Sequence, residues 1–214
     1  MRGVEHYFSA EPAAAARRRH IEFAVLGREF RLAAAGGVFS AARLDPGTAV
    51  LLHKAPMPQP GFEGALLDLG CGYGPIAAVL ATVAPQAKVF AVDVNRRALE
   101  LVLENSAALG IADRVIAATP DEVPPEVAFG QIWSNPPVRI GKQELHAMLE
   151  RWLPRLAPDG DAWLVVARNL GADSLQRWLV GGGWSVERHA SQKGYRILRV
   201  RKPGDAAPDV AQNC

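Results

Sequence analysis

The chain has 214 residues, of which 49% are hydrophobic and 21% are charged, and its formal net charge is +2. This composition is typical of a single globular α/β domain that is long enough to bury a full core. No apolar run in the sequence reaches the ~20 residues that a membrane-spanning helix needs, so we expect no such helix. Glu5, His6 and Glu11 interrupt the region where a signal peptide would need an apolar stretch. We therefore expect a cytoplasmic protein with no membrane partner.

The two cysteines, Cys71 and Cys214, are too few for a disulfide framework or a zinc site. We expect both to be free thiols and expect no bound metal. Positive charge is uneven along the chain, with one basic run at 17–20 and a second group between Lys193 and Lys202. The small net charge neither requires nor excludes nucleic acid, so each group is either a solvated surface or a nucleic-acid contact.

The first part of the chain predicts an irregular lead-in over residues 1–16, followed by a β-hairpin. Strand-like runs at His20–Leu26 and Arg28–Ala34 meet around Gly27. A turn then leads into a short helix, Ala49–Lys54, with Thr48 as its expected N-cap. We assign residues 1–60 to an N-terminal extension whose hairpin packs on the domain that follows.

From residue 65 onward strands and helices alternate, which predicts a mostly parallel sheet with helices on both faces. The last two strands have a short link at 190–194, and because parallel neighbours need a long crossover, these two form an antiparallel hairpin. We expect a domain over 61–202 with a seven-stranded sheet that contains one antiparallel strand, then a flexible tail at 203–214. A turn is expected at 158–160. The expected strands are Ala65–Leu69, Lys88–Val92, Val115–Ala118, Val127–Ser134, Ala162–Ala167, Trp184–His189 and Tyr195–Arg201, and the expected helices are Pro75–Val83, Arg96–Leu109, Gln143–Leu156 and Ser174–Val180.

A glycine-rich loop follows the first strand of this sheet. It contains Gly70, Gly72 and Gly74, with Cys71 between the first two, and Asp68 stands two positions ahead of it. Glycines let the backbone turn tightly and approach a ligand closely, and the loop lies between a strand and a helix. The pattern D-x-G-x-G-x-G resembles motif I of S-adenosylmethionine (SAM)-dependent methyltransferases. The resemblance implies that the loop and the positive helix end face the SAM carboxylate, and that Asp68 interacts with its ammonium group.

Acidic residues also end the next two strands. Asp93 follows Gly70 at close to the ~20-residue offset of the acid that binds ribose hydroxyls in nucleotide-binding folds. We expect Asp93 and the adjacent Val94 to contact the cofactor, the alternative for Asp93 being a cap for the following helix. Asp121 is a candidate acceptor for the adenine amino group, a role that backbone groups at 118–119 suit equally well.

The fourth strand ends in Asn135-Pro136-Pro137, which resembles motif IV of methyltransferases that act on exocyclic or amide nitrogens. An aromatic amine is a poor nucleophile, because its lone pair is delocalised into the ring. The Asn135 side-chain oxygen and the Pro136 carbonyl can each accept one N–H, which favours a pyramidal nitrogen and stabilises the positive charge that grows on it. An Asn-Pro turn is also a common strand breaker, but this one lies where open α/β sheets bind ligands. We predict that Asn135 and Pro136 are catalytic and that Asn135 also contacts the cofactor.

Further strings resemble the methyltransferase small domain family: His6–Ser9, Gly37–Ser40, Leu44–Thr48, Val138–Lys142 and Lys193–Arg196. The resemblance covers nearly the whole chain and implies a class I SAM methyltransferase with a Rossmann-like fold. In particular, the chain is similar to the second, catalytic domain of RsmC-type guanine-N2 methyltransferases of small-subunit ribosomal RNA. This similarity implies SAM as cofactor and ribosomal RNA, or the small ribosomal subunit, as partner. It also implies that Asp45 and Thr48 form part of the SAM pocket wall.

One position departs from the RsmC pattern. In those enzymes an aromatic residue follows N-P-P and can stack on a flipped base, whereas here Val138 follows Pro137. Either another residue stacks, for which Phe39 is the candidate if it is not a core aromatic, or the substrate differs. We expect Pro137 and Val138 to line the substrate site. Arg139 and Lys142 are candidates for phosphate contacts, the alternative being a solvated helix start.

The favoured function is methylation of an exocyclic base amine of RNA, with guanine N2 in small-subunit ribosomal RNA as the leading candidate. Protein glutamine N-methyltransferases share N-P-P, but a tyrosine follows it there, and the sequence shows no helical N-terminal domain of their kind. A non-catalytic SAM- or RNA-binding assembly factor is a third possibility, against which the intact Asn135 argues. A monomer or a homodimer is expected.

Overall fold

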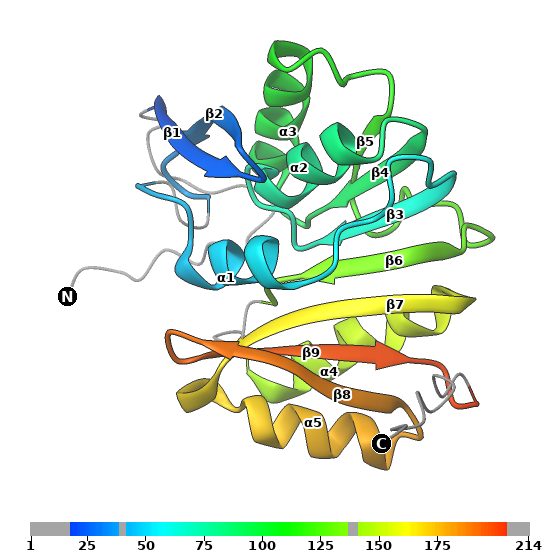
Figure 1. The fold of residues 1–214 in the computed structure, drawn as a ribbon. Coiled ribbons are helices and arrows are strands. Elements are labelled where there is room, and N and C mark those ends of the chain that lie inside the picture. The colour runs from blue at the N-terminus through cyan, green and yellow to red at the C-terminus, as the bar shows by residue number, and fades with distance from the viewer. Residues whose placement is uncertain (1–17, 39–41, 137–140, 205–214) are drawn as a thin grey trace, which may run out of the picture.

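The computed structural model describes residues 18–38, 42–136 and 141–204. Within these ranges a two-stranded sheet, β1-β2, accompanies a seven-stranded sheet of order β5-β4-β3-β6-β7-β9-β8 (Figure 1). The strands are β1 (Arg18–Val25), β2 (Arg28–Ala35), β3 (Gly64–Leu69), β4 (Ala87–Val92), β5 (Val115–Ala118), β6 (Phe129–Ser134), β7 (Leu156–Ala167), β8 (Ser185–Gln192) and β9 (Tyr195–Arg201). The α-helices are α1 (Pro46–Lys54), α2 (Pro75–Val83), α3 (Arg96–Ala108), α4 (Lys142–Trp152) and α5 (Ala172–Gly181).

The seven-stranded sheet confirms the predicted topology. Strands β5, β4, β3, β6 and β7 pair in parallel, and β9 is antiparallel to both of its neighbours, β7 and β8. Strand β3 is central, with β4 on one side and β6 on the other. The chain moves outward from β3 in one direction and returns to build the other half. Open α/β sheets bind ligands where the strand order reverses in this way, outside the carboxyl ends of the strands.

The two faces of the sheet carry separate hydrophobic cores. Consecutive β3 residues alternate between them, as the period of a strand requires. Leu66 packs with α1, α2, α3 and the β1-β2 hairpin, whereas Leu67 and Leu69 pack with α4 and α5. All three side chains are buried. Because both faces are covered, β3 is almost fully apolar, and its one charged residue, Asp68, is conspicuous.

The predicted N-terminal hairpin is present, and β1 pairs with β2 in antiparallel register. Leu26 and Gly27 form its two-residue turn, with φ angles of 53° and 72°, and two positive φ angles match the right-handed twist of the flanking strands. The first strand therefore ends at Val25 instead of Leu26. The side chains of Ile21, Val25, Phe30 and Leu32 share one face of the hairpin and are buried, so this face packs against the rest of the molecule.

The N-cap predicted for the first helix is wrong. The cap is Asp45, whose Oδ2 accepts a hydrogen bond from the Thr48 backbone N–H at 3.0 Å. Pro46 and Gly47 belong to the first turn, where proline is tolerated because its missing N–H would have no helical partner. Thr48 therefore lies inside α1.

Several other element boundaries differ from the sequence-based expectation, the start of β7 and the end of α4 most of all. The turn expected at 158–160 lies inside β7, which begins at Leu156, with a register irregularity against β6. Helix α4 ends at Trp152 and a 3₁₀ turn with Pro154 follows it, because proline lacks the N–H that would continue the helix. Among the described residues no helix is long and apolar enough to span a membrane.

Candidate active site

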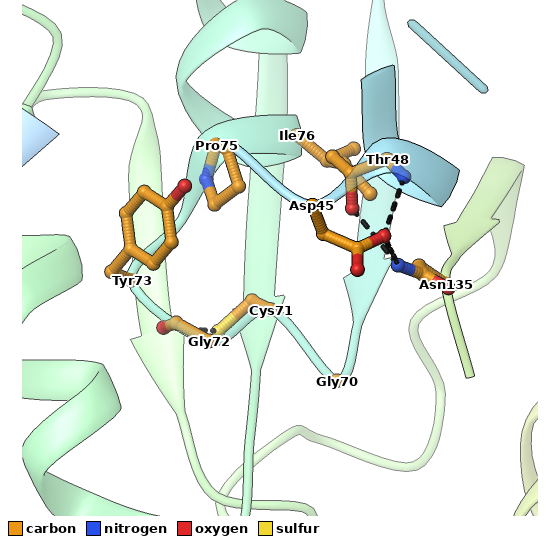
Figure 2. Close-up of a pocket in the computed structure, with 9 residues that line it drawn as sticks. All are labelled: Asp45, Thr48, Gly70, Cys71, Gly72, Tyr73, Pro75, Ile76 and Asn135. Atoms are coloured by element: carbon orange, nitrogen blue, oxygen red, sulfur yellow. Dashed lines mark hydrogen bonds between the residues drawn. The ribbon is translucent and has the colours of Figure 1, made fainter. Parts of the chain in front are cut away.

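A pocket lies at the carboxyl ends of β3 and β6, where the start of α1 covers them. It is lined by Asp45, Thr48, Gly70, Cys71, Gly72, Tyr73, Pro75, Ile76 and Asn135 (Figure 2). Three segments that are far apart in the sequence therefore meet here: the glycine loop, the end of β6 and the turn before α1. Each of them contains residues singled out in the sequence.

The glycine loop adopts a backbone that requires glycine. Gly70, Gly72 and Gly74 have φ angles of 74°, 55° and 84°, in the left-handed region that other residues rarely enter. The backbone N–H groups of Gly70 and Cys71 donate to the Val92 carbonyl at 2.8 and 3.0 Å. The loop is thus tied to the end of β4. The Cys71 thiol is free and buried, and its burial raises its pKa well above the ordinary value.

Asp68 lies fully buried at the end of β3, behind the glycine loop. Its Oδ2 accepts a hydrogen bond from the Ala77 N–H in the first turn of α2, at 2.9 Å, and its Oδ1 has no partner among the described residues. Burial raises the pKa of Asp68 to about 8; the Ala77 hydrogen bond opposes this rise, and the charge of Asp93 adds to it. An unpartnered buried carboxyl oxygen suits a cationic ligand group, because such a group would stabilise the ionised form.

Asp93 follows β4 and is less buried than Asp68. Its Oδ2 accepts from the Gly72 N–H and its Oδ1 from the Asn95 N–H, both at 2.9 Å. Desolvation raises its pKa, and these backbone hydrogen bonds oppose the rise. The alternative role of helix cap is excluded, because Asn95 caps α3 by accepting from the Arg97 N–H at 3.0 Å. The adjacent Val94 is 44% exposed. Ribose binding by Asp93 and the cofactor contact of Val94 stay predictions.

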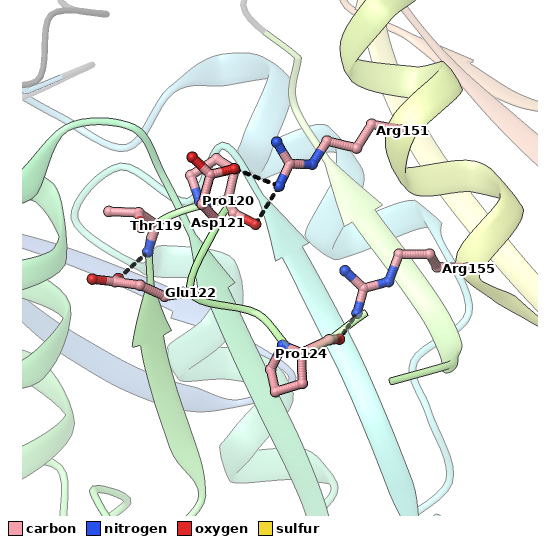
Figure 3. Close-up of polar contacts among 7 residues, drawn as sticks. All are labelled: Thr119, Pro120, Asp121, Glu122, Pro124, Arg151 and Arg155. Carbon is pink, nitrogen blue, oxygen red and sulfur yellow. Dashed lines mark hydrogen bonds and ion pairs between the residues drawn. The ribbon is translucent and has the colours of Figure 1, made fainter. Parts of the chain in front are cut away.

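The loop after β5 is held by arginines of α4 and of the turn that follows it (Figure 3). Arg151 donates to the Pro120 carbonyl at 2.6 Å and pairs with Asp121 at 2.8 Å. The Asp121 side chain is 90% exposed and its carboxylate pairs with Arg151. Its contact with the adenine amino group stays a prediction. The Thr119 N–H, one of the alternative adenine contacts, donates to Glu122 at 2.7 Å, and this backbone hydrogen bond lowers the pKa of Glu122.

Asn135 stands at the end of β6, and the pocket contains its side chain. The preceding Ser134 hydroxyl donates to the Leu69 carbonyl at 2.7 Å, which joins the ends of β6 and β3. The Asn135 Nδ2 group donates to Asp45 Oδ2 at 2.6 Å and to Thr48 Oγ1 at 3.0 Å (Figure 2). Within the described ranges its Oδ1 accepts no hydrogen bond. Both residues predicted to line the cofactor pocket from the α1 side thus contact the predicted catalytic amide.

Sequence reasoning missed Tyr73 and Asn95. Tyr73 is buried, its hydroxyl has no partner among the described residues, and burial, reinforced by the charge of Asp45, raises its pKa. Nothing in its position between two glycines distinguishes this tyrosine from an ordinary loop residue. The Asn95 Nδ2 group donates to the Gly37 carbonyl at 2.9 Å. Its position directly before a helix was the available signal.

The predicted substrate residues are only partly described. Pro136 is buried directly after Asn135, and Lys142 is exposed as the first residue of α4. Phe39, Pro137, Val138 and Arg139 lie outside the described residues. Among residues that the structure does describe, no group of three or more His, Cys, Asp or Glu side chains could hold a metal ion.

Residues 29–199 match the family model of the methyltransferase small domain. The chain belongs to this family. It is a SAM-dependent methyltransferase, and its buried Asp68 oxygen, its tight glycine loop and the helix end behind that loop fit an amino-acid ligand with an ammonium and a carboxylate group. A protein of Bacillus subtilis with the name YbxB is 33% identical over 92% of this chain and 98% of its own length.

Other relatives are longer proteins. The ribosomal RNA small subunit methyltransferase C of Aeromonas hydrophila is 41% identical over 61% of this chain, and that of Pseudomonas aeruginosa strain UCBPP-PA14 is 35% identical over 90%. The chain spans 36% and 57% of their respective lengths. A solved structure described as the T. thermophilus 16S rRNA N2 methyltransferase RsmC with AdoMet and guanosine matches 90% of this chain and 52% of that chain, with a TM-score of 0.71 and 24% identity. It shows the same fold.

Proposed function

We propose that this chain transfers a methyl group from SAM to an exocyclic base amine of RNA, and that its target is guanine N2 in small-subunit ribosomal RNA. One observation carries the proposal. The Asn135 amide lies in the pocket beside the glycine loop with its nitrogen engaged by Asp45 and Thr48. Its oxygen is left without a partner among the described residues and is available to a substrate N–H.

The residues around the pocket divide the task between cofactor and substrate. When bound, SAM supplies a methyl group on a positively charged sulfur. Asp68 would hold the ammonium group through its unpartnered Oδ1, and Asp93 would accept from the ribose hydroxyls. Asn135 Oδ1 and the Pro136 carbonyl would accept the two N–H bonds of the substrate amine. The amine nitrogen would form its new bond to the methyl carbon as the bond from that carbon to the SAM sulfur breaks, with S-adenosylhomocysteine as the leaving group. The surplus proton of the nitrogen would pass to water, so no titrating base is needed before transfer.

The choice of RNA is supported by the relatives. Two of the similar proteins carry the name of ribosomal RNA small subunit methyltransferase C, and the solved T. thermophilus structure is described with guanosine bound. An exocyclic amine such as guanine N2 needs two acceptors and no strong base, which is the chemistry that Asn135 and Pro136 provide. The relatives and the site therefore favour the same class of substrate.

The experiment is a transfer assay with methyl-labelled SAM and small ribosomal subunits from cells that lack this gene. After the reaction, nuclease and protease digestions divide the label between RNA and protein. We expect nuclease-sensitive label with the wild type and none with Asn135→Ala, while both bind SAM in a separate binding measurement. Label that only protease releases would contradict the proposal and favour a protein amide as substrate. A loss of methylation that is fully accounted for by lost SAM binding in the variant would contradict the substrate-facing role given to Asn135.

A further inference from the structure

We infer that Asp45 is a positioning residue that decides which end of the Asn135 amide faces the substrate. The effect on turnover rests on the proposed function, whereas the contact itself does not. Asp45 belongs to the turn before α1 and Asn135 to the end of β6, 90 positions later. The short contact between them, at 2.6 Å, joins the N-terminal extension to the predicted catalytic residue.

A side-chain amide has two ends of similar shape and opposite hydrogen-bonding character. If Asn135 presents its oxygen, it accepts an N–H of the substrate amine and stabilises the growing positive charge. If it presents its NH2 group, donor faces donor and the amine is repelled. Proper function therefore requires the pocket to distinguish two rotations of the same group, and sterics alone cannot do so.

Asp45 makes this distinction because an ionised carboxylate only accepts hydrogen bonds. With the observed rotation, Nδ2 donates to Asp45 Oδ2 and to Thr48 Oγ1. With the opposite rotation, the Asn135 oxygen would face the carboxylate at the same distance, which is repulsive. Thr48 cannot decide by itself, since a hydroxyl accepts or donates according to its neighbour. Asp45 therefore sets the orientation and Thr48 supports it.

The carboxylate is itself held in place. Its Oδ2 also accepts from the Thr48 N–H as the cap of α1. A Cβ atom at Gly47 would lie 2.9 Å from Asp45 Oδ2 and 2.9 Å from Cε1 of Tyr195, so the carboxylate and the tyrosine ring both approach Gly47 closely. This crowding, together with the helix cap, restricts movement of the group that orients Asn135.

The contact also strengthens the acceptor that it orients. An amide whose N–H bonds donate to an anion and a hydroxyl becomes more polarised, and its oxygen becomes a better acceptor. The benefit is greatest when the substrate nitrogen becomes positive, so it acts on turnover more than on binding. A residue that merely contacted SAM would act on cofactor affinity instead.

The first test is Asp45→Ser, because an asparagine that capped α1 through the position of Oδ2 would still present an oxygen to Asn135. Serine caps helices about as well as aspartate, so α1 and the melting temperature should be retained, but its shorter side chain removes the carboxylate that faces Asn135. We expect kcat to fall by about 10- to 100-fold, in the range seen on removal of one transition-state hydrogen bond. The dissociation constant of SAM should change by less than about threefold, because the contact with Asn135 acts on turnover more than on SAM binding. Thr48→Val is the matched control and should cost less, because Asp45 still dictates the orientation.

The second test exchanges the partners. Asn135→Asp alone opposes two carboxylates, whereas Asp45→Asn with Asn135→Asp lets the new amide donate to the new carboxylate, with loss of the hydrogen bond that caps α1, and leaves an acceptor facing the pocket. The double variant should turn over at least about tenfold faster than Asn135→Asp alone, because the two effects are coupled through one contact. A double variant no faster than Asn135→Asp would overturn the inference, as would an Asp45→Ser variant whose only defect is weaker SAM binding.

A third readout does not depend on any substrate. The NMR signals of the Asn135 side-chain NH2 group are assigned by their absence from the Asn135→Ala spectrum. In the wild type their chemical shifts should differ from those of a solvent-exposed asparagine, and their protons should exchange slowly with solvent. In Asp45→Ser their chemical shifts and exchange rates should move toward those of a solvent-exposed asparagine. Unchanged signals would overturn the inference. If the wild type methylates neither RNA nor ribosomal subunits, the proposed function fails, and these amide signals still decide whether Asp45 orients Asn135.

Discussion

Asn105 of α3 holds Ala33 of β2 by both of its backbone polar groups. Its Oδ1 accepts from the Ala33 N–H at 2.7 Å, and its Nδ2 donates to the Ala33 carbonyl at 3.0 Å and to the Tyr73 carbonyl at 2.9 Å. All these contacts are buried. One amide thereby connects the N-terminal hairpin, a helix of the main domain and the glycine loop.

Replacement of this amide should be costly. Asn105→Ala leaves buried backbone groups of Ala33 and Tyr73 without partners, which we expect to lower the free energy of unfolding by about 3 kcal/mol. Urea unfolding measures the loss. Glu104→Ala is the control on the same helix, because it removes only the exposed ion pair with Arg18 and should cost less than about 1 kcal/mol. Equal losses in the two variants would mean that Asn105 does not join the hairpin to the domain.

Burial of Asp68 predicts a specific pH dependence of stability. Its pKa rises from 3.8 to about 8 on folding, so the unfolded state releases a proton that the folded state retains between these values. Stability from this group is present at low pH and is lost as the pH rises. Relative to Asp68→Asn, the wild type should lose about 1 kcal/mol of unfolding free energy per pH unit between about pH 5 and pH 8. Urea unfolding of both proteins over this range measures the difference, and a constant or growing advantage of the wild type would contradict the burial of this carboxyl.

The acids assigned to the ribose and to the adenine of SAM should differ in their effect on SAM affinity. Asp93 is mostly buried beside the glycine loop, whereas Asp121 is exposed and paired with Arg151. We expect Asp93→Asn to raise the SAM dissociation constant by about 10- to 100-fold, because a ribose hydroxyl loses a charged acceptor. Asp121→Asn should change it by less than about threefold, since this carboxylate is directed to Arg151. Calorimetric titration with SAM measures the dissociation constants of both variants. A larger effect at Asp121 would favour its carboxylate as the adenine contact.

The structure separates the members of the second basic group. Arg196 and Arg199 form ion pairs with Asp173 and Asp161, so their charges are used within the fold. Lys193 is exposed in the turn between β8 and β9, has a positive φ of 50°, and borders two surface hollows. Among the described residues it forms no ion pair, which leaves it available to an RNA phosphate.

Lys193→Ala should therefore weaken RNA binding and reduce the slope of log affinity against log salt by about 1. The matched control is Lys88→Ala. Lys88 is an exposed residue at the amino end of β4, whereas ligands bind at the carboxyl ends of the strands. A salt titration of RNA binding measures both variants. If the two lysines have the same effect, the charge at Lys193 has no specific part in RNA binding.

Periodic and motif-bearing features were predictable from the sequence. The alternation of apolar strands with helices, the short link between the last two strands and the glycine loop after β3 predicted the sheet, including the antiparallel β9. These signals are local, because strand periodicity, glycine spacing and loop length depend on neighbouring residues only. They also indicated Asp68, Asp93 and Asn135 as residues at the ligand-binding edge.

Long-range contacts were not predictable. The sequence placed Asp45 and Thr48 on the cofactor pocket, but their hydrogen bonds to Asn135 depend on how α1 packs across the end of β6. In the same way, nothing near Arg151 in the sequence indicated that it would engage Asp121. The N-cap error at α1 has a local cause, because both Asp45 and Thr48 suit a cap and Pro46 at the first helical position decides between them.

Identification of the methylated nucleoside tests the proposed role of Asn135 most directly. Small-subunit RNA is methylated by the purified protein in ribosomal subunits from cells that lack the gene, digested to nucleosides and analysed by mass spectrometry beside the Asn135→Ala reaction. We expect N2-methylguanosine with the wild type and none with the variant. A methyl group on a ring carbon or a ribose oxygen, or equal methylation by both proteins, would contradict an amine-directed site built on Asn135.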